Sequence, residues 1–213
     1  MKEGKSLMEN STTSYNNYVN LSGTVVEECM FTHEVYGEGF YVFKMEVKRL
    51  SDSADILPVT ISDILVDLSL IKLGMFISIT GQLRSYNHYS SQKNKLVLST
   101  FARDIDLDPD GDKNPNEIFL NGFICKPSVF RTTPFGREIC DLLIAVNRNY
   151  GKSDYIPCIA WGRNAKFAGN LIVGTNVEIW GRIQSRKYQK KIDNGEVEER
   201  IAYEVSISKI EHI

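Results

Sequence analysis

The segment Asp55-Ile56-Leu57-Pro58 recurs 99 positions later as Asp154-Tyr155-Ile156-Pro157. Other segments match at the same spacing or one residue beyond it. They are Leu21-Ser22-Gly23 with Leu120-Asn121-Gly122, Val47-Lys48-Arg49 with Val146-Asn147-Arg148, and Ile79-Thr80-Gly81-Gln82 with Ile179-Trp180-Gly181-Arg182. Matches this numerous at one spacing indicate that the chain is a tandem duplication of a unit of about 95 residues.

Each unit has the sequence pattern of a mostly β structure. Tyr41, Phe43, Met45 and Val47 fall at every second position, which is the period of a half-buried strand. The glycines inside the later strand pattern, Gly81 and its repeat partner Gly181, suit a bend in a curled sheet. One short helix is expected between the third and fourth strands of each unit. The two expected helices cover residues 64–68 and 165–168.

Five strands with one helix at that position is the order of the OB-fold, a small Greek-key barrel that mainly binds oligonucleotides and oligosaccharides. A two-sheet sandwich fits less well, because such folds usually need about seven strands. We therefore predict an all-β chain of two tandem five-stranded OB barrels. The predicted parts are a flexible tail at 1–16, a first barrel at 17–105, an acidic linker at 106–115 and a second barrel at 116–213.

Composition excludes several classes of protein. The chain of 213 residues has 25 Lys+Arg against 27 Asp+Glu, so its net charge of −2 excludes a uniformly polybasic nucleic-acid binder. The charge is uneven, however: −5 up to residue 115 and +3 from residue 116 onward. No stretch approaches the roughly 18 apolar residues of a membrane span, and the first residues lack the apolar segment of a secretory signal. We therefore expect a cytoplasmic protein without membrane contact.

The sequence predicts no metal site and no cofactor. The four cysteines show no CxxC spacing and the three histidines are scattered, so reduced thiols are the expected state. The linker formally fits a calcium-binding EF-hand loop, with Asp106, Asp108 and Asp110 as ligands, Gly111 at the turn and Glu117 at the last position. Strands rather than helices are expected on both sides of it, and two prolines stiffen it. An acidic, solvated linker is therefore the favoured interpretation.

The fourth strand of the second unit carries an unusual row of outward-facing side chains. Val177, Ile179 and Ile183 take the inward positions. The outward row is Trp180, Arg182, Gln184, Arg186 and Tyr188. Aromatic rings stack on unpaired bases and cations follow the phosphates, so this row predicts a surface for single-stranded nucleic acid. Lys187 and Lys190 on the following hairpin would extend it, although lysines also protect edge strands.

Three segments of the second unit carry a family resemblance. Residues 154–165 look like an aromatic-rich third strand followed by a Phe-Gly-Lys-type turn into the helix. Residues 177–188 look like a fourth strand with the pattern Gly-x-Leu-x-Thr/Ser-Arg-x-aromatic, and Tyr203-Glu204-Val205 matches a Thr-Glu-Val in the fifth. Together they resemble the bacterial single-stranded DNA-binding protein family. The resemblance implies a protein that coats single-stranded DNA largely regardless of sequence, in replication, repair or recombination.

The resemblance also implies particular binding residues. The family stacks DNA on a few aromatic side chains. The matching positions here are Tyr150, Tyr155, Trp161 and Tyr188. Nearby cations that would contact phosphates are Arg148 and Arg163. Any one of these rings could instead pack at the rim of a barrel, but four together favour the binding interpretation.

The first unit departs from this pattern. At the four matching positions it has only one ring, that of a histidine. Those positions are Ser51, Ile56, Ser62 and His88. We therefore predict that the second unit supplies most of the affinity. The first unit would supply assembly and a weaker groove through Arg84, Tyr86 and Tyr89.

The resemblance leads to expectations about partners and location. Family members usually gather four barrels, so two barrels per chain predict a homodimer. The chain stops at Ile213 without the family's flexible stretch and acidic tip, so recruitment of replication proteins through such a tail is not expected. The family would place the protein at the bacterial nucleoid. A scaffold for a replication or conjugation complex is the alternative function, and RNA binding is a weaker one.

An enzyme is not expected. The sequence shows no glycine loop for phosphates, no arrangement of a nucleophile with a base, and no cluster of metal ligands.

Overall fold

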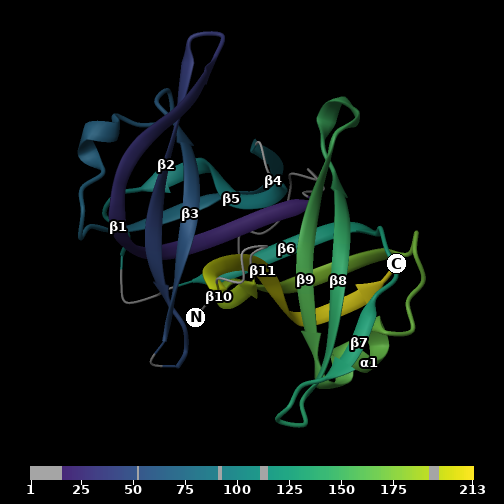
Figure 1. Cartoon of the computed structure of the whole chain (residues 1–213). Coiled ribbons are helices and arrows are strands. Elements are labelled where there is room, and N and C mark those ends of the chain that lie inside the picture. The colour runs from purple at the N-terminus through teal and green to yellow at the C-terminus, as the bar shows by residue number, and fades with distance from the viewer. Residues whose placement is uncertain (1–15, 52, 91–92, 111–114, 192–196) are drawn as a thin grey trace, which may run out of the picture.

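The computed structural model describes residues 16–213 except 52, 91–92, 111–114 and 192–196 (Figure 1). Side chains at 88–90, 93–95 and 190–191 also lie outside the description. Strands β1 to β5 make the N-terminal barrel, and β6 to β11 make the C-terminal barrel. In order the strands are β1 Asn17–Val35, β2 Glu38–Lys48, β3 Ala54–Ser62, β4 Phe76–Ser90, β5 Lys93–Asp106, β6 Asn116–Ile124, β7 Val129–Thr132, β8 Glu138–Asn147, β9 Ser153–Trp161, β10 Asn176–Lys191 and β11 Val197–His212.

The N-terminal barrel has the strand order expected for an OB-fold. Its strands follow the order β2-β3-β5-β4-β1, and an additional pairing of β2 with β1 closes the barrel. All of these neighbours are antiparallel except β3 and β5, which run parallel through Val59 and Thr60. The prediction of an all-β, OB-type chain is confirmed.

The C-terminal barrel repeats this order with one difference. The counterpart of the long strand β1 is divided into β6 and β7. The break contains Pro127, which has no backbone N–H to donate to a sheet and is therefore disfavoured inside a central strand. The repeat partner of Pro127 in the N-terminal barrel is Glu28, which lies within the unbroken β1.

The two expected helices differ from each other. In the C-terminal barrel, α1 spans Gly162–Ala168 and includes the helix predicted at 165–168. In the N-terminal barrel a single 3-10 turn, η1 Leu68–Leu70, replaces the helix predicted over 64–68. The hydroxyl of Ser62 accepts a hydrogen bond from the N–H of Ile64, and the carboxylate of Asp67 accepts one from Ser69. Such local bonds compete with helix formation.

Alternating side chains fill the two cores. Phe43, Met45 and Val47 are fully buried, and their repeat partners on β8 are also buried. Gly81 and Gly181 lie at β-bulges where the sheets bend. A Cβ atom at Gly81 would lie 2.1 Å from the backbone oxygen of Phe101, and one at Gly181 would lie 2.2 Å from that of Ser206. Only glycine fits such an approach. The four cysteines are free thiols.

The two barrels join through a continuous sheet. β1 pairs antiparallel with β6, and in this register Val19 lies opposite its own repeat partner, Ile118. The barrels are therefore related by a local two-fold axis at this pair. Two repeat-related asparagines make equivalent contacts in the two barrels. The side chain of Asn17 exchanges hydrogen bonds with the backbone of Leu83, and that of Asn116 does the same with Ile183.

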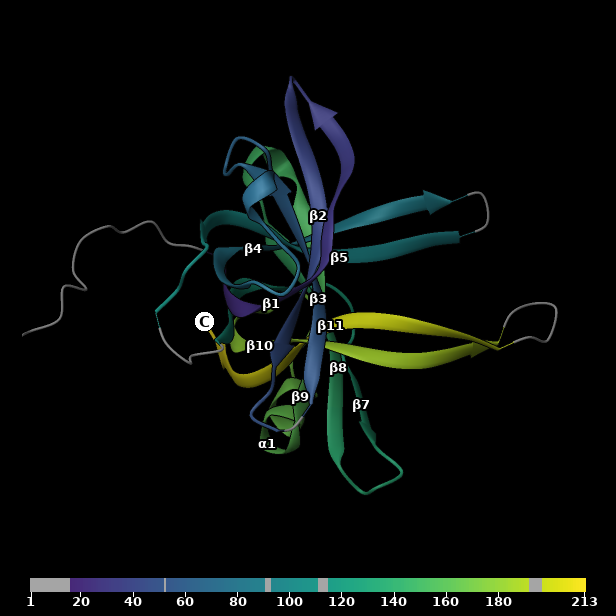
Figure 2. The same cartoon turned by 90° about the vertical axis from the view of Figure 1, so that its left-hand side faces the viewer.

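The long hairpins of the two barrels extend in one direction. Figure 2 shows the β4–β5 and β10–β11 ribbons leaving the body on the same side. In the described part of the chain, no helix is long and apolar enough to cross a membrane. The same residues contain no group of three or more potential ligands that could hold a metal ion. Gly111, part of the predicted linker and of its EF-hand pattern, lies outside them.

Candidate nucleic-acid interface

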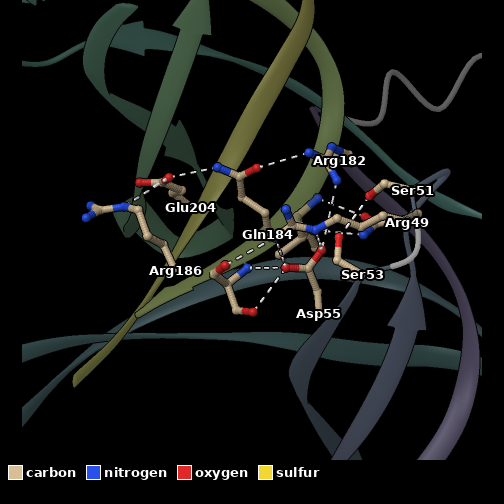
Figure 3. Close-up of polar contacts among 11 residues, drawn as sticks. Arg49, Ser51, Ser53, Asp55, Arg182, Gln184, Arg186 and Glu204 are labelled. Atoms are coloured by element: carbon tan, nitrogen blue, oxygen red, sulfur yellow. Dashed lines mark hydrogen bonds and ion pairs between the residues drawn. The ribbon is translucent and has the colours of Figure 1, made fainter. Parts of the chain in front are cut away.

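Two buried carboxylates link the barrels in addition to the pairing of β1 with β6. The side chain of Asp55, at the start of β3, is fully buried and accepts two hydrogen bonds from Arg49, at 2.7 and 2.6 Å. From the other barrel, Ser185 donates both its backbone N–H and its hydroxyl to the same carboxylate, and Arg182 lies 4.0 Å away (Figure 3). We call Asp55, Arg49, Arg182 and Ser185 the Asp55 seam.

The same arrangement occurs at the repeat-related position. The fully buried Asp154, at the start of β9, accepts hydrogen bonds from Arg148 of its own barrel. It also accepts them from Arg84 and from the backbone of Ser85 on the N-terminal barrel. We call these four residues the Asp154 seam. Each seam combines two guanidinium groups with one carboxylate, so each keeps one net positive charge.

A polar chain runs from the Asp55 seam along β10. Arg182 donates to Gln184 at 3.3 Å, and Gln184 donates to Glu204 at 2.8 Å. Arg186 forms an ion pair with Glu204 at 3.6 Å (Figure 3). These contacts orient Arg182, Gln184 and Arg186. Gln184, expected to face outward, is buried and only 7% exposed.

Trp161, at the end of β9, lies beside this row. Its indole N–H donates to the hydroxyl of Ser206 at 3.2 Å, and the residue is 37% exposed. It lines a groove of about 460 Å³ that we call the Trp161 groove. The other main lining residues are Arg49, Arg137, Arg182, Gln184 and Arg186. A ring among four guanidinium groups suits an unpaired base with its phosphates.

Two more predicted residues adjoin the Trp161 groove. The guanidinium of Arg186 lies 5.9 Å from the ring centroid of Tyr188, farther along β10. Arg163, in the first turn of α1, is exposed and lines a second hollow beside Trp161. The structure therefore brings Trp161, Arg163, Arg182, Arg186 and Tyr188 to one side of the C-terminal barrel.

Tyr150 lies elsewhere, next to the Asp154 seam. It is fully exposed and has a left-handed backbone (φ 62°), which is uncommon for a residue with a side chain. Together with Lys152 it lines a groove of about 620 Å³ that we call the Tyr150 groove. The arginines from the two barrels in this groove are Arg84, Arg103 and Arg148.

Tyr155 lies between these two grooves. It shares a face of β9 with Trp161, six residues and about 20 Å along the strand. Tyr155 is 46% exposed, and its backbone N–H donates to the hydroxyl of Ser85 at 2.7 Å. Tyr150, Tyr155 and Trp161 therefore follow the length of the β8–β9 ribbon, with Tyr150 and Trp161 near its opposite ends. Tyr188, the fourth predicted stacking residue, lies on β10 instead.

The remaining predicted residues have varied surroundings. Trp180 packs against Phe119, with ring centroids 5.2 Å apart, and Lys209 covers its ring at 4.2 Å. Lys187 is exposed and pairs with Glu199 at 3.0 Å. Tyr86 is 48% exposed, and burial raises its pKa. The side chains of Lys190 and Tyr89 lie outside the described residues.

Sequence reasoning missed several residues of these surfaces. Arg49 and Arg137 line the Trp161 groove, and Arg103 lines the Tyr150 groove. Phe40 and Phe101, on the outer surface of the N-terminal barrel, were also missed. Phe40 and Phe101 are not at positions of the N-terminal unit that match rings of the C-terminal unit, so a comparison limited to such positions does not find them. The spacing of Phe101 and Arg103, two residues apart in a strand, was the available signal, since it places both on one face.

Comparison with known proteins agrees with this arrangement. Residues 115–213 match the single-strand binding protein family. Single-stranded DNA-binding protein 2 of Listeria innocua is 32% identical over 81 residues, which cover 35% of this chain and 51% of that protein. Single-stranded DNA-binding protein 1 of Staphylococcus aureus is 32% identical over 83 residues, which cover 36% and 50%. The chain thus spans about half the length of these curated relatives.

Solved structures show the same fold over nearly the whole chain. The wild-type single-stranded DNA binding protein from Thermus aquaticus superposes with a TM-score of 0.72 at 19% identity and covers 92% of both chains. A deletion mutant of the same protein gives a TM-score of 0.70. The C-terminal barrel of this chain is thus similar in sequence to the single-strand binding protein family, and the chain shares the two-barrel fold of the Thermus protein.

Proposed function

We propose that the chain is a single-stranded DNA-binding protein and not an enzyme. It would hold unpaired strands largely regardless of base sequence, by stacking bases on exposed rings and pairing phosphates with arginine and lysine. Residues 115–213 match a family named for this activity, and the curated relatives carry the same name. Coating of single strands in replication, repair or recombination is the corresponding cellular role.

The Trp161 groove is the observation that carries this proposal. An indole ring fixed at its N–H by Ser206 stands among four arginines, and the row continues through Arg186 to Tyr188. Every base has a flat face, so stacking on such rings is tolerant of sequence and contributes about 1–3 kcal/mol per base. The surplus positive charge of the Asp55 seam at the edge of this groove favours a polyanion.

A fluorescence titration tests the proposal. Oligo-dT should quench the emission of Trp161, whose ring is exposed in the groove, whereas duplex DNA at the same phosphate concentration should quench it far less. Each phosphate neutralised on a single strand contributes about −0.7 to the slope of log K against log salt. Engagement of the Trp161 groove arginines predicts a slope of about −2 to −3. Equal binding of duplex and single strand would contradict the proposal.

We further propose that the C-terminal barrel supplies most of the affinity. It carries the ring positions shared with the family, and its described surface gathers Trp161, Arg182 and Arg186 in one groove. The N-terminal barrel, as a divergent copy, would contribute assembly and a weaker contact through Arg84 and Tyr86.

Two barrels per chain support a homodimer with four barrels. Closed two-fold symmetry is the commonest arrangement of identical chains. Light scattering at micromolar concentration should then give a mass of about twice the 24.2 kDa of one chain. A mass equal to one chain, unchanged by added oligo-dT, would exclude this assembly.

A further inference from the structure

The outer surface of the N-terminal barrel carries a row of flat groups that none of the expected positions accounts for. The ring of His33 stacks on Phe40, with centroids 5.0 Å apart and planes 17° apart. Phe40 lies 5.9 Å from Phe101, and the guanidinium of Arg103 stands 4.9 Å from the centroid of Phe101. We call His33, Phe40, Phe101 and Arg103 the ladder.

The ladder lines a groove with a volume of about 1010 Å³, larger than the Trp161 groove and the Tyr150 groove. We call it the ladder groove. Its walls come from the β1–β2 hairpin and from β3, β4 and β5. Besides the ladder, its lining includes Tyr36, Val42, Thr60 and Tyr86. In OB-folds, the face formed by strands 2 and 3 with the adjoining loops is where oligonucleotides bind. The ladder groove therefore lies where this fold places a ligand, and it is mainly apolar and aromatic.

Charge at one end of the groove favours an anion. Arg84 and Arg148 line both the ladder groove and the Tyr150 groove, and so does Arg103. Arg84 and Arg148 share the single carboxylate of Asp154, so this end keeps a positive surplus. The guanidinium of Arg103 lies over the ring of Phe101, and no carboxylate among the described residues forms an ion pair with it.

The ladder is not a copy of the rings in the C-terminal barrel. At the matching strand positions of that barrel, Ile139 replaces Phe40 and Ser206 replaces Phe101. Ser206 there holds the indole of Trp161, whose own counterpart in the N-terminal barrel is Ser62. The C-terminal barrel therefore carries its ring, Trp161, on the third strand, whereas the N-terminal barrel carries Phe101 on the fifth strand of the same face.

We infer that the ladder is a second binding site for unpaired bases, and that a strand lying in it continues across the Asp154 seam onto Tyr150 and Lys152 of the other barrel. The inference rests on the proposed single-strand binding. Bases would stack on the rings and on the flat guanidinium of Arg103, as they do on aromatic and arginine planes elsewhere. Phosphates would then meet the shared arginines of the seam.

Two lengths of oligo-dT separate this site from the Trp161 groove. A single OB barrel covers about 4–16 nucleotides, so an oligonucleotide of about 8 fits one barrel and one of about 30 can reach both. In the full chain, Phe101→Ala should weaken binding of the long oligonucleotide by about 5-fold or more. Binding of the short one, held by the Trp161 groove, should change less than about 2-fold.

Phe31→Ala is the matched control. Phe31 is also an exposed aromatic residue of the N-terminal barrel, 5.4 Å from the ring of Tyr41, but it does not line the groove. It should leave both affinities unchanged. Arg103→Gln removes an exposed cation without affecting the core, and it should reduce the salt slope for the long oligonucleotide by about 0.7.

The outcomes are distinct. If the unmodified chain binds neither oligonucleotide, the proposed function fails and the ladder site fails with it. If the chain binds both oligonucleotides but Phe101→Ala and Arg103→Gln match the unmodified chain at both lengths, the proposed function stands and the ladder inference is overturned. Thermal unfolding of each variant should be measured as a check that the barrel is intact. A groove occupied by a protein partner instead of DNA would give this second result.

Discussion

Replacing Asp55 with alanine is expected to lower the free energy of unfolding by roughly 3 kcal/mol, because removing one partner of a buried ion pair usually costs about 3–5 kcal/mol. The lower end applies here because Arg49 and Arg182 are partly exposed, with 26% and 38% of their side chains accessible. The substitution leaves these two like charges facing each other and also removes the acceptor for Ser185 of the other barrel. Urea unfolding followed by circular dichroism measures the loss.

Asp141→Ala is the matched control for Asp55→Ala. Asp141 also forms an ion pair with an arginine, Arg131, at 2.7 Å, but both side chains are well exposed. Exposed pairs contribute about 1 kcal/mol or less, so the control should be nearly as stable as the unmodified chain. Equal losses in the two variants would show that the Asp55 seam contributes no more than a surface pair.

The same carboxylate predicts a dependence on pH. Burial acts to raise the pKa of Asp55, but hydrogen bonds from Arg49 and Ser185 and the charge of Arg49 outweigh it, so the pKa lies below its ordinary value. Because the folded pKa is the lower one, this stabilisation is complete above the unfolded value of about 4 and is lost as the pH falls through the folded value. The difference between the unmodified chain and Asp55→Ala should therefore shrink below about pH 4.

Removing both Tyr155 and Trp161 is expected to reduce affinity for oligo-dT by about 30-fold or more, since each stacked base contributes about 1–3 kcal/mol. Both rings are exposed on one face of β9, and neither fills a core. Their replacement by alanine should therefore affect binding far more than folding. Anisotropy of a labelled oligo-dT is the suitable measurement, because the double variant lacks the Trp161 fluorophore.

Ile172→Ala provides the control for loss of exposed apolar surface. Ile172, in the loop before β10, is 75% exposed, more than Trp161, and does not line any of the grooves described here. It should bind like the unmodified chain. Trp161→Phe keeps a ring and should recover part of the affinity. A double variant that binds as tightly as Ile172→Ala would disprove stacking on β9.

The fold could be predicted because its evidence is local or repeated. The amino-acid sequence shows the duplication at one spacing, the alternation around Phe43 and the glycines at the bends. The helix of the N-terminal barrel could not be placed, because Ser62 and Asp67 bind nearby backbone groups and replace it with a single turn. Such competition depends on geometry that residue patterns do not show.

The site was predictable only within single strands. The row of β10 and the ring of Trp161 were identified, and the structure brings them together. Contacts between the barrels were not foreseeable, because they depend on the register of β1 against β6. That register places Arg84 and Arg148 on one shared carboxylate, and it places Tyr150 beside cations of the other barrel.

Covalent fusion frees the two halves from having identical sequences. In a pair of identical subunits, any substitution at one junction would appear at the other as well. Here the two junctions already differ, since Arg84 lies 2.9 Å from Asp154 whereas Arg182 lies 4.0 Å from Asp55. The tether also keeps each half at high effective concentration while its surface diverges. If the proposed function holds, a strand laid across this molecule would therefore meet two unlike junctions, whereas a pair of identical subunits would present two equal ones.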